Sequence, residues 1–114
     1  MVEDESVLSR PSRELDDVVA WGRGPDDVAD VRHGDPALPL VILIHGGFWR
    51  PAYDRVHVRA TTEALADEGF TVAAPEYRRV PGDPDATVED VAASLAVLPA
   101  QLAGRHDGRV VVLG

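Results

Sequence analysis

The sequence of 114 residues contains no cysteine, and all 11 of its basic residues are arginine. Without cysteine there is no disulfide, no thiolate nucleophile and no cysteine-ligated zinc. Without lysine, a P-loop lysine and a lysine Schiff base are excluded as well. The apolar runs all fall well short of the roughly 20 residues that a membrane-spanning helix needs. A chain of this length has room for one small domain.

Positive charge is scarce, because 20 acidic residues leave the chain with a formal net charge of −9. Nucleic acids and anionic membrane surfaces both bind basic faces, so we expect neither as a partner. The histidines show no metal-binding spacing such as H-E-x-x-H, and we expect no metal site. The N-terminal stretch is acidic and polar and does not look like a secretory signal, so the expected location is the cytoplasm.

The first third of the chain is predicted to form a flexible N-terminal segment followed by a β-hairpin. Residues 1–15 are polar and are expected to be flexible. Two short β-rich segments, 16–22 and 28–34, flank a turn marked by glycine and proline. We therefore predict an antiparallel hairpin at a margin of a sheet.

The rest of the chain alternates between strand and helix patterns. Residues 40–44 form a continuous apolar run typical of a strand buried on both faces, and residues 70–77 and 109–114 repeat that pattern. Helical patterns fall between them, at 54–68 and from Thr87 onward. The predicted class is α/β, with a mostly parallel sheet of about five strands and two crossover helices.

The ends of both helices carry local signals. Asp54 and Thr87 are residue types that cap helix starts, and each is predicted to do so. Gly69 suits a left-handed helix ending, after which Phe70 would fold back onto Leu65. Pro99 is expected to kink the second helix or end it early.

The segment after the first buried run, His45-Gly46-Gly47-Phe48-Trp49, carries the main functional signal. In open α/β sheets, ligands bind beyond the carboxyl ends of the strands. Glycine lets the backbone approach a ligand closely. Backbone N–H groups in this loop could therefore stabilise a developing negative oxygen, as an oxyanion hole does. The alternative is a glycine-lined tight turn.

This segment and those that follow it resemble the N-terminal part of an α/β-hydrolase, in particular the esterase and arylformamidase-like group. HGGFW (45–49) is similar to the oxyanion loop after the third strand of that fold. PEYRRVPG (75–82) resembles the Tyr-Arg segment that follows the fourth strand of that fold. TVEDVAASLAVL (87–98) resembles the helix that leads to its fifth strand, and RVVVLG (109–114) resembles the fifth strand itself. The resemblance runs from about Asp16 onward and predicts one unit over 16–114.

The resemblance implies a role for each residue of the loop. The N–H groups of Gly47 and Phe48 would donate to the oxyanion, Gly46 would shape the loop, and His45 would brace it. Phe48 and Trp49 are candidates for the substrate pocket, with simple packing as the alternative. The implied reaction is hydrolysis of a small carboxylic ester or amide through an acyl-enzyme, without a cofactor.

The sequence departs from the family at the nucleophile. It stops at Gly114, the first glycine of the G-x-S-x-G motif, so we expect a truncated fragment that is inactive alone. The edge of strand 110–113 would then be open and ready to pair with another chain. Alternatives are a non-catalytic binding module or one half of a split enzyme. A nucleotide-binding domain is disfavoured because no G-x-G-x-x-G motif is present.

Three polar residues stand at the end of the second buried run and the start of the loop after it. Tyr77 and Arg78 are expected to fix the loop through a hydrogen bond or an ion pair. Glu76 is expected to be solvated or paired with an arginine rather than to act as a catalytic acid.

Overall fold

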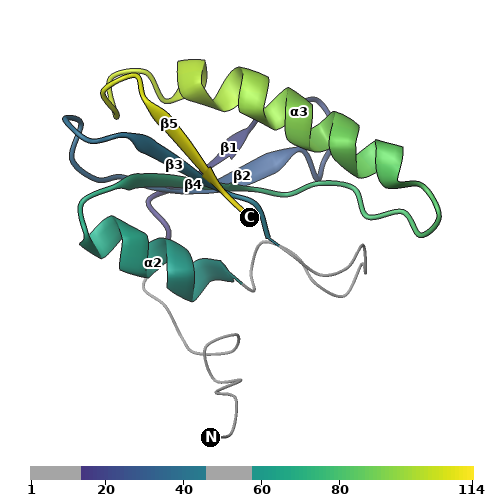
Figure 1. Ribbon diagram of the computed structural model, residues 1–114, viewed down its shortest axis with the longest axis horizontal. Helices are drawn as coiled ribbons and strands as arrows, with labels where there is room; N and C mark the ends of the chain where they lie inside the picture. The colour runs from purple at the N-terminus through teal and green to yellow at the C-terminus, as the bar shows by residue number, and fades with distance from the viewer. Residues whose placement is uncertain (1–13, 46–57) are drawn as a thin grey trace, which may run out of the picture.

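The computed structural model describes residues 14–45 and 58–114. They form a five-stranded sheet and two helices in the predicted order β-β-β-α-β-α-β (Figure 1). The elements are β1 (Asp17–Ala20), β2 (Val28–Arg32), β3 (Leu40–Leu43), α2 (Arg59–Asp67), β4 (Thr71–Pro75), α3 (Pro84–Gln101) and β5 (Val110–Leu113).

The sheet has the strand order β1-β2-β4-β3-β5. β1 pairs antiparallel with β2, as the predicted hairpin requires, and β2 pairs antiparallel with β4. β3 is parallel to both of its neighbours, with Val41 opposite Val72 on one side and Val111 on the other. Because β3, β4 and β5 are parallel, their carboxyl ends lie at the same edge of the sheet.

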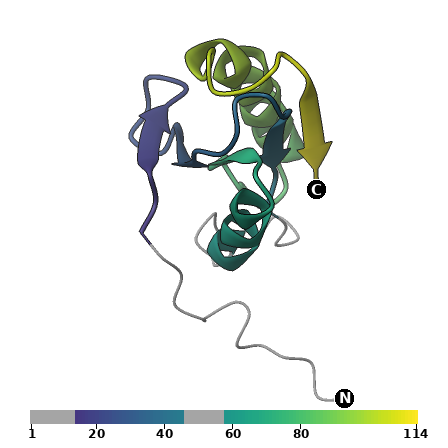
Figure 2. The same ribbon diagram turned by 90° about the vertical axis from the view of Figure 1, so that its left-hand side faces the viewer.

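The two helices cover opposite faces of the sheet, α3 on one and α2 on the other (Figures 1 and 2). Leu40 and Ile42 belong to the core cluster that includes Leu98 of α3. Val41 and Leu43 belong to the other cluster, against which Leu65 of α2 packs. Successive side chains of a strand point to opposite faces, so a strand between two helix layers must be apolar throughout. This explains the unbroken apolar run of β3.

The helix α2 begins later than predicted and ends as predicted. It starts at Arg59, and its N-cap is Val58, whose own side chain makes no capping hydrogen bond. Asp54, the predicted cap, lies outside the described residues. Val58 packs against the cluster around Val41, so apolar packing marks the start of the helix. At the other end Gly69 has a φ of 104°, and the Phe70 amide donates to the Leu65 carbonyl at 3.2 Å. The Schellman ending is confirmed.

The helix α3 begins three residues earlier than predicted. It begins at Pro84, and the Thr87 hydroxyl donates to the Arg78 carbonyl instead of capping the helix. Proline suits the first helical turn, where its missing N–H has no helical partner to lose. Pro99 does not end the helix, which runs on to Gln101. The Pro99 carbonyl accepts a hydrogen bond from Nε2 of His106 at 2.9 Å, and His106 lies in the turn that leads to β5.

The strand β2 carries two buried charges that its sequence did not reveal. Asp30 and Arg32 are each only 1% exposed. Arg32 Nε donates to Thr62 Oγ1 of α2 at 2.9 Å, and Asp30 accepts from Arg59 Nε at 3.0 Å. α2 is therefore fixed to β2 by polar contacts. Of the two helices in the described ranges, neither is long and apolar enough to cross a membrane.

Candidate functional site at the carboxyl ends of β3 and β4

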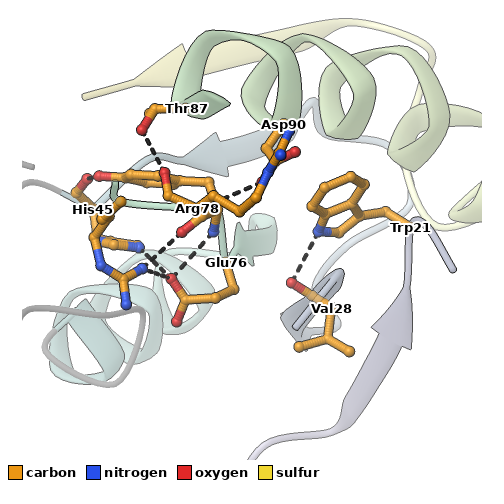
Figure 3. A network of polar contacts seen from close by, with 9 residues as sticks. Trp21, Val28, His45, Glu76, Arg78, Thr87 and Asp90 are labelled. Atoms are coloured by element: carbon orange, nitrogen blue, oxygen red, sulfur yellow. Dashed lines mark hydrogen bonds and ion pairs between the residues drawn. The ribbon is translucent and has the colours of Figure 1, made fainter. Parts of the chain in front are cut away.

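A buried histidine and a buried glutamate meet where β3 and β4 end. His45 lies two residues beyond β3, and Glu76 follows β4 directly. They are 2% and 5% exposed, and His45 Nε2 lies 2.8 Å from Glu76 Oε1 (Figure 3). The parallel pairing of β3 with β4 brings the two side chains together, although 31 positions separate them in the sequence.

Three donors converge on the same oxygen of Glu76. Besides His45 Nε2, the Tyr77 backbone amide donates to Oε1 at 3.1 Å, and Arg79 Nη1 forms an ion pair with it. An ionised carboxylate only accepts hydrogen bonds, so the shared proton belongs to His45 Nε2. The geometry therefore selects the form of His45 that carries a hydrogen on Nε2.

Tyr77 holds both the ring and the backbone of His45. The two rings are stacked with centroids 4.2 Å apart and planes 11° from parallel, and the Tyr77 hydroxyl donates to the His45 carbonyl oxygen. Arg79 Cζ lies 5.8 Å from the Tyr77 ring centroid, within cation–π range. Burial raises the pKa of Tyr77 above its ordinary value, with the Arg79 charge opposing and the Glu76 charge reinforcing that shift. The hydroxyl thus stays protonated and able to donate at neutral pH.

The next residue ties this segment to α3. The Arg78 backbone amide and Nε donate to Asp90 Oδ2 at 2.8 and 3.0 Å (Figure 3). Arg78 Nη2 also donates to Glu89 Oε2 at 3.1 Å. The predicted structural roles of Tyr77 and Arg78 are confirmed. The arginine pairing expected for Glu76 is confirmed too, whereas a solvated Glu76 was wrong because the side chain is buried.

Of the residues predicted for the site, His45 lies in the described part of the chain. Gly46, Gly47, Phe48 and Trp49 lie outside the described residues, so their oxyanion and pocket roles stay predictions. Sequence reasoning did not place Glu76 in the site. One signal was present: Glu76 directly follows a buried strand next to the one that leads to His45.

Solved structures with the same architecture include Esterase B from Lactobacillus rhamnosis, with a TM-score of 0.74 and 25% sequence identity. The match covers 95% of this chain and 38% of that esterase. The chain has part of the α/β-hydrolase fold. An ester hydrolase from the Lake Arreo metagenome (TM-score 0.66, 23% identity) and a putative thioesterase from Silicibacter sp. TM1040 (0.64, 21%) also match over 95% of this chain.

These two further matches cover 37% and 39% of the neighbours' chains, so the shared part of the α/β-hydrolase fold is less than half of each. No protein-family model and no curated protein sequence matches the chain. Within the α/β-hydrolase fold, the His45–Glu76 pair lies at the strand edge beyond which open α/β sheets bind ligands.

Proposed function

We propose that this chain is part of a serine hydrolase that cleaves carboxylic esters or related amides, aryl formamides among them. Its own contribution is half of the oxyanion hole, made of the backbone N–H groups of Gly47 and Phe48. The proposal is supported by the α/β-hydrolase architecture shared with Esterase B and by the HGG-aromatic-Trp sequence that follows β3.

The observation that carries the proposal is the fixation of His45. Its ring bonds to Glu76 and stacks on Tyr77, and its carbonyl accepts from the Tyr77 hydroxyl. An oxyanion hole is effective when its donors are already oriented before charge develops, because no energy is then needed to reorganise them. A buried and fixed residue directly before Gly46 is the kind of anchor that such donors require.

The covalent step is assigned to residues outside these 114. The sequence contains no G-x-S-x-G motif. Ser94 is buried in α3, where its hydroxyl donates to the Val91 carbonyl at 2.8 Å, so it is not placed to act as a nucleophile. The proposed role of these residues is therefore to bind the oxygen that gains charge, and none of them is assigned as nucleophile, acid or base.

The proposal is tested by titrating the chain with ethyl butylphosphonate, a stable monoanion that imitates the charged tetrahedral centre. One solved structure of Esterase B is inhibited by a tributyrin phosphonate, and the Lake Arreo hydrolase was solved in complex with a bipyridine phosphonate derivative. In amide NMR spectra we expect saturable shifts of the Gly47 and Phe48 signals at millimolar ligand. Unchanged signals at both positions, or shifts of equal size over the whole surface, would contradict the proposal.

A second candidate function is self-association through β5, and a specific observation favours it. The four side chains of β5 are apolar, yet each is 40–49% exposed, and in the described part of the chain β5 pairs with β3 alone. Leu40 and Ile44 amides donate to the carbonyls of Arg109 and Leu113. Since alternate residues of a strand point to opposite sides, Val110 and Val112 direct their N–H and C=O groups away from β3.

For this candidate we propose that β5 pairs with β5 of a second copy. Val112→Pro removes one outward N–H group without removing a bond to β3, so it should convert a dimer into a folded monomer. Val112→Thr keeps the N–H group and is the matched control. Light scattering after size-exclusion chromatography measures the mass, and higher salt should strengthen a dimer of such acidic chains. A wild-type monomer at millimolar concentration would exclude this candidate.

A further inference from the structure

The buried carboxylate of Glu76 is more than one half of an ion pair. Its Oε1 accepts from the His45 ring, the Tyr77 backbone and Arg79, and so joins the end of β3 to the segment after β4. A simple pair with Arg79 would not need the contact to His45. A buried carboxylate that accepts from three donors fixes the positions of all three.

We propose that Glu76 is a positioning residue for the anion-binding loop, an inference that rests on the proposed function. Its charge holds His45 with a hydrogen on Nε2 and holds the ring in one orientation. The ring in turn stacks on Tyr77, whose hydroxyl fixes the His45 carbonyl. Glu76 thereby sets the backbone from which the chain continues toward Gly47, without touching the substrate itself.

The proposed role of Glu76 depends on its negative charge, as the contacts of Arg79 and Tyr77 indicate. Arg79 Nη1 donates to Oε1 and also to the Tyr77 carbonyl, the latter at 2.8 Å, so the cation faces the carboxylate from the same segment. The Arg79 side chain is 13% exposed and that of Glu76 is 7% exposed. Water screens such a pair weakly, and the Arg79 cation favours the ionised carboxylate, which acts only as an acceptor.

The decisive variant is Glu76→Gln, which keeps the size of the side chain and one acceptor oxygen but removes the charge. The first readout is the nitrogen NMR spectrum of the His45 ring, which distinguishes a hydrogen on Nε2 from one on Nδ1. A hydrogen bond to a charged group is stronger than a neutral one, so the preference for Nε2–H should fall about tenfold in the variant. The second readout is the affinity for ethyl butylphosphonate, which should fall by a similar factor.

Glu89→Gln is the matched control, because Glu89 also pairs with an arginine of the same segment but is exposed. It should leave both readouts unchanged. A Glu76→Gln chain with the wild-type His45 spectrum and wild-type phosphonate affinity would overturn the proposal. A wild-type His45 ring with its hydrogen on Nδ1 would overturn it as well, even if the variant failed to fold.

The two readouts separate this inference from the proposed function. If the wild-type chain did not bind phosphonate, the oxyanion proposal would fail, and the His45 spectrum would still decide whether Glu76 fixes the ring. If Glu76→Gln altered the His45 spectrum but left the phosphonate affinity of the wild type, the link from Glu76 to the loop would be wrong.

Discussion

Replacing Gly34 with alanine should strongly destabilise the fold, so that the variant unfolds at urea concentrations at which the wild type is still folded. A Cβ atom at this position would lie 2.3 Å from the Gly69 carbonyl oxygen and 2.4 Å from the carbonyl carbon and oxygen of Phe70. All three are backbone atoms, so no side-chain rotation relieves the overlap. The segment after β2 would have to separate from the end of α2.

That separation would break the contacts that join these two segments. The Gly34 amide donates to Thr71 Oγ1 at 3.0 Å, and the Asp35 amide donates to the Gly69 carbonyl at 2.6 Å. Overpacking against movable side chains costs about 1–3 kcal/mol. Against backbone, with these hydrogen bonds lost, we expect more than about 3 kcal/mol, a large part of the ~5–15 kcal/mol that stabilises a typical domain.

Gly82→Ala is the matched control for Gly34→Ala. Gly82 has a φ of 81°, but a Cβ there would meet nothing within 4 Å. Only the left-handed backbone conformation is penalised, at about 1–2 kcal/mol. Urea unfolding followed by circular dichroism measures both variants. Equal losses of stability in the two would show that the close approach of Gly34 to the Gly69–Phe70 backbone is wrong.

The parts of the fold that the sequence predicted are those with a local cause. An apolar run without alternation, such as β3, occurs where both faces of a strand are covered, and both faces of β3 are covered. The end of α2 could be predicted from Gly69 and Phe70 for an equally local reason, since glycine adopts a positive φ easily. The parallel pairing of β3 with β5 followed from the intervening helices.

The errors arose where tertiary contacts outweigh residue type. Thr87 is a good capping residue, yet its hydroxyl serves the Arg78 carbonyl, in a different segment. Asp30 and Arg32 are residue types usually found at the surface, yet both are buried here. Asp30 pairs with Arg59 of α2, and Arg32 bonds to Thr62 of the same helix. No sequence window contains those partners, since about 30 positions separate each pair. Patterns within one element do not reveal such contacts.

The same limit applies to the candidate site. His45 could be singled out because glycines and aromatic residues follow it directly in the sequence. The contact of Glu76 with His45 could not be predicted in this way, because it depends on the parallel register of β3 and β4, which brings two distant strand ends together. Residues that hold a functional loop in place are therefore harder to predict from sequence than the loop itself.

The central claim is that backbone N–H groups after His45 bind a developing oxyanion. Phe48→Pro tests it most directly because proline has no N–H group, while Phe48→Leu changes the side chain and keeps that donor. Losing one oxyanion-hole donor typically costs a factor of about 10²–10³ in catalysis, so binding of a charged analogue should also fall steeply.

The measurement is the dissociation constant of ethyl butylphosphonate for the wild type and both variants, read from amide NMR shifts. The spectra of core residues such as Val41 and Leu98 serve to confirm that each variant is folded. The account predicts that Phe48→Leu binds within a few-fold of the wild type, and that Phe48→Pro binds at least about tenfold more weakly. A folded Phe48→Pro chain with wild-type affinity would contradict it.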